Sequence, residues 1–123
     1  SVSLECVWSG KSVKQYDIDH ALPFSIWRNN DIWNLFPADS KVNNSKRDKL
    51  PSRSLLGKSR TRIYSYWDMY FEKVSNLFLY QAGNFCGSRF TGLTKDTRES
   101  LFSTFSETVE IAAEQRGVER WEG

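Results

Sequence analysis

Apolar and polar residues change period about halfway along the chain, and the two halves predict different elements. In the first half, a short apolar segment from Val2 to Trp8 precedes a turn at residues 9–11, and a loosely alternating stretch runs from Val13 to His20. Alternation with a period of two is typical of a strand with one buried face. These two segments therefore predict a β-hairpin.

A second strand and a short helix are predicted directly after this hairpin. The polar, proline-containing residues 22–31 indicate a loop, and the apolar residues 32–36 indicate a strand that Pro37 ends. Asp39 or Ser40 can then cap a short helix, because both side chains accept hydrogen bonds from free backbone N–H groups. The predicted order is strand, loop, strand, helix.

In the second half, apolar residues recur at steps of three and four, which predicts helices. One aromatic-rich helix is expected from about Arg60 to Gln81, and another from about Lys95 to Arg116, ended by Gly117. The stripe of the first helix consists of Ile63, Tyr66, Trp67, Tyr70, Val74, Leu77 and Phe78. We read this stripe, and Trp33 before it, as core. The predicted fold class is α+β.

Length and composition indicate one globular domain. The 123 residues are 39% hydrophobic and 15% aromatic, enough to bury a core. We find neither a membrane-spanning apolar run nor the features of a signal peptide, so we expect a cytoplasmic protein. Cys6 and Cys86 are expected to be buried thiols that form neither a disulfide nor a zinc site. A chain that starts at Ser1 without methionine suggests a domain of a longer protein.

A net charge of only +2 conceals an uneven distribution. Residues 46–62 contain seven basic residues and one acidic residue, whereas residues 95–123 contain seven acidic and four basic residues. A basic run is often just a solvated face, but it also suits a polyanionic partner.

The candidate chemistry lies beside this basic run, around the one histidine of the chain. Asp19 and His20 end a predicted strand, and combine a carboxylate with an imidazole, a group whose ordinary pKa of about 6.5 suits proton transfer near neutrality. Asn43 on the predicted short helix adds a neutral oxygen ligand. Such a sparse oxygen site suits Mg²⁺, which keeps several waters and completes its shell with phosphate oxygens. Together with Lys46, these residues indicate metal-assisted phosphodiester hydrolysis.

At these positions the sequence resembles a known family. Asp19-His20, Asn34 in an apolar run, and Asn43-Asn44-Ser45-Lys46 resemble the HNH endonuclease motif of the ββα-metal fold, in its variant with a final asparagine. The segments DIDHALPFS, NDIWNLFP and VNNSKRDKLPS are also similar to the HNH domains of bacterial restriction-type enzymes and CRISPR effector nucleases. The resemblance covers Tyr16 to Ser52. It implies a ββα-metal core over residues 1–52, backed by a helical extension over residues 53–123.

The resemblance also implies a role for each motif residue. His20 would be the general base that activates water, and Asp19 and Asn43 would hold one Mg²⁺ or Mn²⁺ ion. Asn34 would brace the loop and orient His20, while Lys46 would either contact the phosphate or steady the helix turn of Asn43. The implied activity is hydrolysis of DNA, one strand at each site.

Several alternatives stay open. The lysine spacing favours Asn43 over Asn44 as the metal ligand. Asp17 is either a support for the site or a strand residue paired with a lysine. Trp27 either stacks on a base or packs in the core. Many relatives carry two CxxC zinc pairs, but Cys6-Val7-Trp8-Ser9 stands where the first would be. We therefore expect no structural zinc.

The expected partner is DNA, held through backbone phosphates by Arg47, Lys49, Arg53 and Lys58. The resemblance suggests bacterial or phage defence or restriction as the setting, and a homodimer or additional domains of a parent protein are left open. Two rival hypotheses are a catalytically inactive DNA-binding HNH-like module and a helical protein-interaction domain.

Overall fold

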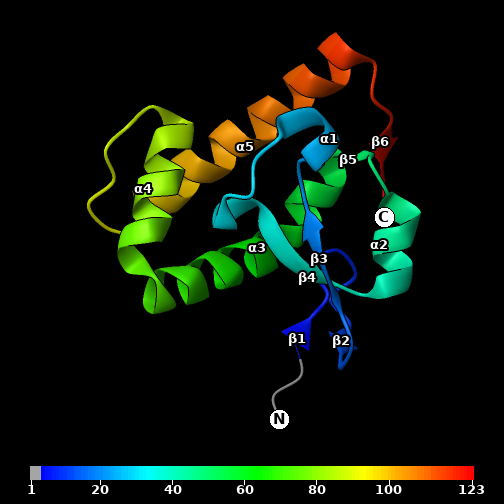
Figure 1. The fold of residues 1–123 in the computed structure, drawn as a ribbon, viewed down its shortest axis with the longest axis horizontal. Coiled ribbons are helices and arrows are strands. Elements are labelled where there is room, and N and C mark those ends of the chain that lie inside the picture. Colours follow the sequence, from blue (N-terminus) through cyan, green and yellow to red (C-terminus); the bar gives the residue numbers. More distant parts are fainter. Residues whose placement is uncertain (1–3) are drawn as a thin grey trace.

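The computed structural model describes residues 4–123 and combines short strands with long helices, so the predicted α+β class is confirmed (Figure 1). The strands are β1 (Leu4–Glu5), β2 (Ser12–Val13), β3 (Asp17–His20), β4 (Leu35–Ala38), β5 (Leu50–Pro51) and β6 (Arg120–Trp121). The helices are α1 (Phe24–Trp27), the 3₁₀ turn η1 (Ile32–Asn34), α2 (Ser40–Lys46), α3 (Arg53–Lys73), α4 (Ser75–Cys86) and α5 (Lys95–Arg116). None of the helices within this described part is long and apolar enough to cross a membrane.

The predicted hairpin is present in part, and the residues of its second strand are divided between two strand pairs. β1 pairs with β2, whereas β3 pairs antiparallel with β4, with His20 opposite Leu35 and Asp19 opposite Phe36. Val2 and Ser3 of the predicted first strand lie outside the described residues. The prediction of one continuous strand from Val13 to His20 was wrong, because a strand pattern shows which face is buried but does not identify the partner strand.

The predicted loop and second strand also differ in detail. The loop contains the short helix α1, and residues 32–34 form a 3₁₀ turn before β4 begins. Pro37 lies inside β4 and does not end it. Proline is tolerated there because β4 belongs to a two-stranded sheet, and the Pro37 carbonyl still accepts a hydrogen bond from the N–H of Val7 at 3.0 Å.

The short helix α2 begins where the capping residues predicted it. The Asp39 carboxylate accepts hydrogen bonds from the N–H groups of Lys41 and Val42. In Figure 1, α2 lies on one side of the β3–β4 pair and α4 on the other. The segment from β3 to α2 is therefore an antiparallel strand pair followed by a helix.

The predicted helix over residues 60–81 is two helices. α3 starts earlier, at a cap formed by Ser52, and ends at Val74, whose backbone (φ −140°, ψ 57°) leaves the helical region before α4 begins. The sequence did not reveal this break because apolar residues keep a helical spacing across it. Val74 and Leu77, which were predicted to be core, are exposed beside the break. By contrast, the prediction for α5 is confirmed, with Thr94 as N-cap and Gly117 in the left-handed conformation (φ 61°).

The core lies between the strand pairs and the three long helices. Trp33 and Trp67 are fully buried, as predicted, and the Trp67 indole donates a hydrogen bond to the Trp33 carbonyl at 2.8 Å. Tyr70 is half-buried and donates to the Leu35 carbonyl at the start of β4. Cys6 is buried, but Cys86 is only half-buried. Helix α3 is thus bonded directly to β4, the strand that pairs with His20.

Candidate functional site

Asp19, His20 and Asn43 line one cavity of about 290 Å³ between the end of β3 and helix α2. Tertiary structure thus brings together the carboxylate, imidazole and amide that the sequence singled out. A larger hollow of about 770 Å³ lies between α4 and the loop after it, but no carboxylate or imidazole lines it. The smaller cavity is the better candidate for chemistry because its lining combines potential metal ligands with a proton acceptor.

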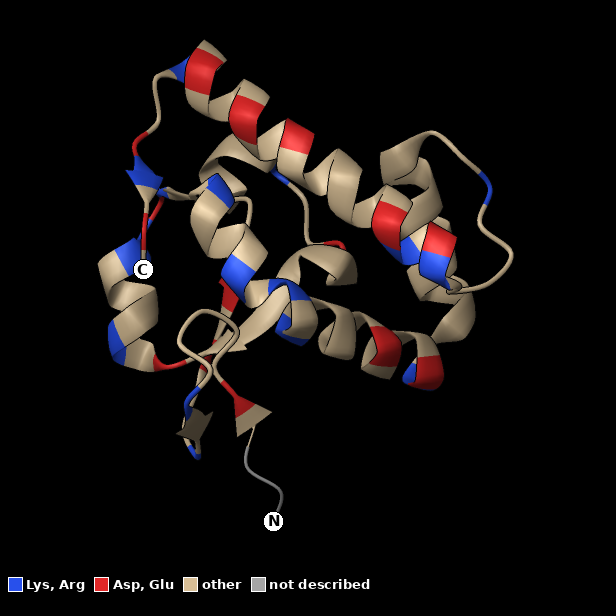
Figure 2. Cartoon of the chain, turned by 180° about the vertical axis from the view of Figure 1, so that it is seen from behind, with Lys and Arg blue, Asp and Glu red and all other residues tan. Residues whose placement is uncertain are grey.

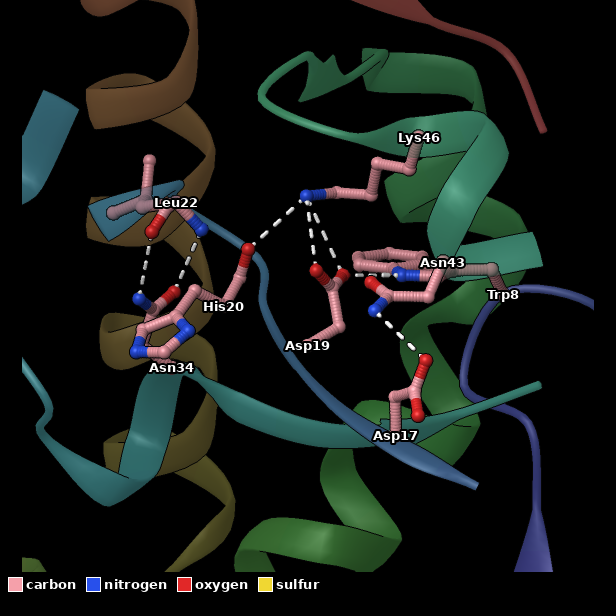
Figure 3. A network of polar contacts seen from close by, with 8 residues as sticks. All are labelled: Trp8, Asp17, Asp19, His20, Leu22, Asn34, Asn43 and Lys46. Carbon is pink, nitrogen blue, oxygen red and sulfur yellow. Dashed lines mark hydrogen bonds and ion pairs between the residues drawn. The ribbon is translucent and has the colours of Figure 1, made fainter. Parts of the chain in front are cut away.

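The Asp19 carboxylate is buried and held from two sides (Figure 3). The Trp8 indole donates a hydrogen bond to Asp19 Oδ2 at 2.8 Å, and the Lys46 ammonium lies 3.4 Å from Oδ1 and 3.3 Å from Oδ2. Burial raises the pKa of this carboxyl group, while the attraction of Lys46 and the indole hydrogen bond oppose that rise. Trp8 was missed by the sequence analysis because nothing in its local pattern points toward a carboxylate eleven residues away.

Lys46 is inside the protein, and its side chain has no exposed surface. Its ammonium also donates to the His20 carbonyl at 3.0 Å, so that one residue of α2 bonds to two residues of β3. Burial lowers the pKa of Lys46, and the charge of Asp19 opposes this. Of the two roles expected for Lys46, the phosphate contact has no support in this position, whereas the bonds to β3 do steady the helix that carries Asn43.

Asn34 bridges the two ends of the connection between β3 and β4. Its amide oxygen accepts from the N–H of Leu22 at 2.7 Å, and its amide nitrogen donates to the Leu22 carbonyl at 2.9 Å. The side chain is fully buried. This is the pairing across the loop that the resemblance implied; the catalytic importance of the brace stays a prediction.

His20 is half-buried at the end of β3. Its Nε2 lies 2.7 Å from the Oδ1 of Asn30, and the Phe24 ring packs against the imidazole edge to face, with 5.8 Å between ring centroids. The sequence suggested that Asn30 is only a loop former, because its contact with His20 depends on how the nine intervening residues fold back.

Asn43 lies on α2, and its amide nitrogen donates to Asp17 Oδ2 at 3.4 Å (Figure 3). The Asp17 carboxylate is therefore bonded to Asn43, and no lysine among residues 4–123 pairs with it. Asn44 is exposed and lines the same cavity, so the choice between the two asparagines stays a prediction.

The residues fit a sparsely ligated hard cation. The Asn43 nitrogen is occupied by Asp17, whereas no group in residues 4–123 donates a hydrogen bond to its Oδ1. No group of three or more His, Cys, Asp or Glu side chains in that range is arranged to hold a metal. The potential metal ligands are therefore the Asp19 carboxylate and the Asn43 amide oxygen. Mg²⁺ and Mn²⁺ bind to such a set when water and phosphate oxygens complete the coordination shell.

The predicted DNA-binding residues do not form one uniform strip. Arg47 is exposed at the rim of the cavity, and Arg53 and Lys58 are exposed on α3. Lys49 lies 3.8 Å from Glu119 and is partly neutralised by it. Two further basic residues of the run serve the fold: Arg60 packs over the rings of Tyr64 and Phe102, and Arg62 donates to the Val7 and Trp8 carbonyls.

Trp27, left open between a base-stacking and a core role, is half-buried and packs edge to face on Phe85 at 5.6 Å. Its ring is therefore engaged by α4. This contact supports the core alternative.

Comparison with known proteins matches the same part of the chain. Residues 6–52 match the family model described as HNH endonuclease. A CRISPR-associated endonuclease Cas9 from Streptococcus mutans serotype c (strain ATCC 700610 / UA159) is 38% identical over 55 residues, which make up 45% of this chain and 4% of that protein. The chain thus spans only a small fraction of this curated relative. No solved structure matches the chain significantly.

The matched residues include the whole β3–β4 pair, the connection between these two strands, and helix α2. Asp19, His20 and Asn43, which line the cavity, all lie in this segment. The resemblance to HNH endonucleases is therefore confirmed for residues 6–52, and it supports a nuclease role in general.

Proposed function

We propose that the protein is a divalent-metal-dependent endonuclease that hydrolyses phosphodiester bonds of DNA, one strand at each active site. The observation that carries this proposal is the meeting of Asp19, His20 and Asn43 at one cavity, inside the segment that matches the HNH endonuclease family. The β3–β4 pair and α2 would form the ββα-metal finger.

His20 is the proposed general base. A water molecule in the cavity would lose a proton to the free ring nitrogen, and its oxygen would form a bond to phosphorus as the bond from phosphorus to the 3′ oxygen breaks. The leaving oxygen would then be protonated by solvent. Positioned proton transfer of this kind typically contributes about 10²- to 10⁴-fold to a rate.

Asp19 and Asn43 are the proposed metal ligands. A bound divalent ion would supply Lewis-acid stabilisation of the charge that develops on the phosphate. Trp8 and Lys46 hold the Asp19 carboxylate in place through its two oxygens, and Asp17 holds the Asn43 amide so that its oxygen is free. Asn34 keeps the connection after His20 closed at its base.

A plasmid assay tests this function. Supercoiled DNA incubated with the protein and Mg²⁺ or Mn²⁺ is expected to give open-circular product first, because one site cuts one strand, and EDTA is expected to abolish the reaction. Linear product at first appearance would instead indicate paired active sites. His20→Ala is expected to lower the nicking rate by about 10²- to 10⁴-fold.

Asn76→Ala, which truncates an exposed amide on α4 away from the cavity, is the matched control and is expected to nick at the wild-type rate. Circular dichroism on all three proteins checks that they are folded. Unchanged nicking by His20→Ala would show that His20 is not the general base.

A further inference from the structure

We propose that Asn30 is a positioning residue for His20: its side-chain oxygen accepts the Nε2–H of the imidazole and so leaves Nδ1 as the nitrogen that takes the proton. This inference rests on the proposed role of His20 as general base. The observation behind it is the distance of 2.7 Å between His20 Nε2 and Asn30 Oδ1.

The chemistry of the amide determines the direction of this hydrogen bond. An amide oxygen only accepts, so Nε2 must carry the hydrogen when it bonds to Oδ1. A neutral imidazole has one N–H, and its other nitrogen then has the free electron pair. Within the described residues, no hydrogen bond involves His20 Nδ1. The contact therefore selects the tautomer in which Nδ1 is the base.

The loop that carries Asn30 is itself held firmly on both sides. Arg28 turns the chain in the left-handed conformation (φ 56°). Asn29 and Asp31 are joined by two hydrogen bonds, at 2.9 and 3.0 Å. The Trp33 indole also donates to Asp31 at 3.1 Å. Asn30 thus lies between two anchored residues, although its own side chain is exposed.

Helix α4 supplies the next support. The Gln81 side-chain oxygen accepts from the N–H of Ile32 at 2.9 Å, and the Phe85 ring stacks on Trp33 with 3.9 Å between centroids. These contacts join residues that are about fifty positions apart. The helical extension therefore also helps to orient His20, because α4 packs against the loop that positions the imidazole.

The test follows the ring nitrogens of His20 by ¹⁵N NMR in metal-free protein at a pH where the imidazole is neutral. The chain has one histidine, so its side-chain signals need no assignment. Wild-type protein is expected to show the Nε2–H tautomer with slowed exchange of that proton. Asn30→Ala is expected to give mixed tautomers and fast exchange, whereas Asn30→Asp keeps an acceptor and should keep the wild-type pattern.

The same variants are compared in plasmid nicking. Asn30→Ala is expected to lower kcat by about 10- to 100-fold with little change in KM, because a misoriented base binds DNA as before but reacts poorly. Asn30→Asp should recover part of that loss, and Asn76→Ala again serves as the control.

Two results would overturn the inference: a wild-type tautomer pattern in Asn30→Ala, or mixed tautomers in Asn30→Ala with no loss of kcat. Failure of the proposed function looks different. In that case, wild-type protein shows no nicking with any metal while Asn30→Ala still changes the tautomer as expected. That result would support the contact between Asn30 and His20 and contradict the endonuclease proposal.

Discussion

On β3, the charged residue Asp19 is buried and the apolar residue Ile18 is exposed, which reverses the usual arrangement. The carboxylate faces inward with 5% of the residue exposed, while the neighbouring isoleucine is 49% exposed. Burying a charge is unfavourable unless it is paired and hydrogen-bonded, and Lys46 and Trp8 meet that need. An apolar residue thus lies at the surface while a carboxylate lines the cavity, and breaks of local pattern of this kind are expected at functional or strained sites.

Lys46→Met should reveal how far this buried ion pair supports the fold. The substitution keeps an unbranched side chain but leaves Asp19 without its cation, so we expect the free energy of unfolding to fall by about 3–5 kcal/mol. Urea denaturation followed by circular dichroism measures this change. Lys41→Met, at an exposed position of the same helix, is the control.

The double variant Asp19→Asn/Lys46→Met removes both charges and is expected to recover part of the lost stability. A loss below about 1 kcal/mol in Lys46→Met would contradict the interpretation, because a surface-like ion pair contributes no more than that.

At the scale of elements, two helical glycines differ in their surroundings. A Cβ atom added at Gly83 in α4 would lie 2.5 Å from the backbone oxygen of Ser88, where the chain folds back after the helix. At Gly57 in α3, no atom lies within 4 Å of the added Cβ. Gly83 is therefore required by a close backbone approach, whereas Gly57 is not.

Alanine at these two positions should change stability in opposite directions. Gly57→Ala is expected to raise the free energy of unfolding by about 0.5–1 kcal/mol, because alanine loses less backbone entropy in a helix. Gly83→Ala is expected to lower it by about 1–3 kcal/mol, because the backbone must shift. Denaturant unfolding of both variants measures the difference. Equal effects would show that the loop after α4 does not pack closely on Gly83.

The charges of the whole molecule are separated in space. Figure 2 shows acidic positions recurring along α5, whereas basic positions lie on α2 and the first half of α3. Arg47, directly after α2, and Arg53 and Lys58 on α3 are exposed and have no ion-pair partner among residues 4–123. We propose that these three contact DNA phosphates, and that the acidic α5 disfavours binding in the opposite orientation.

Salt dependence tests this charge arrangement. Removing one phosphate contact is expected to reduce the slope of log affinity against log salt concentration by about 0.9. Arg53→Ala and Lys58→Ala should each show this reduction on a nonspecific duplex in fluorescence anisotropy. Lys73→Ala, at the far end of α3, should leave the slope unchanged. A wild-type slope near zero would rule out the phosphate contacts.

The sequence by itself determined the features that depend on local pattern and spacing. The α+β class, the bounds of α5 and a short helix capped at Asp39 or Ser40 follow from the periodicity and hydrogen-bonding chemistry of neighbouring residues. The resemblance, from which the roles of Asp19, His20, Asn34 and Asn43 were carried over, likewise rests on motif spacing that the chain displays directly.

Tertiary structure decided everything that depends on which distant segments meet. The pairing of β3 with β4, the break at Val74, the inward turn of Asp19 and the burial of Lys46 are outcomes of packing, which no local pattern encodes. The contacts of Trp8 with Asp19, and of Asn30 with His20, likewise exist only once the intervening chain has folded back. The motif thus singles out the proposed catalytic groups, while long-range contacts set their orientation.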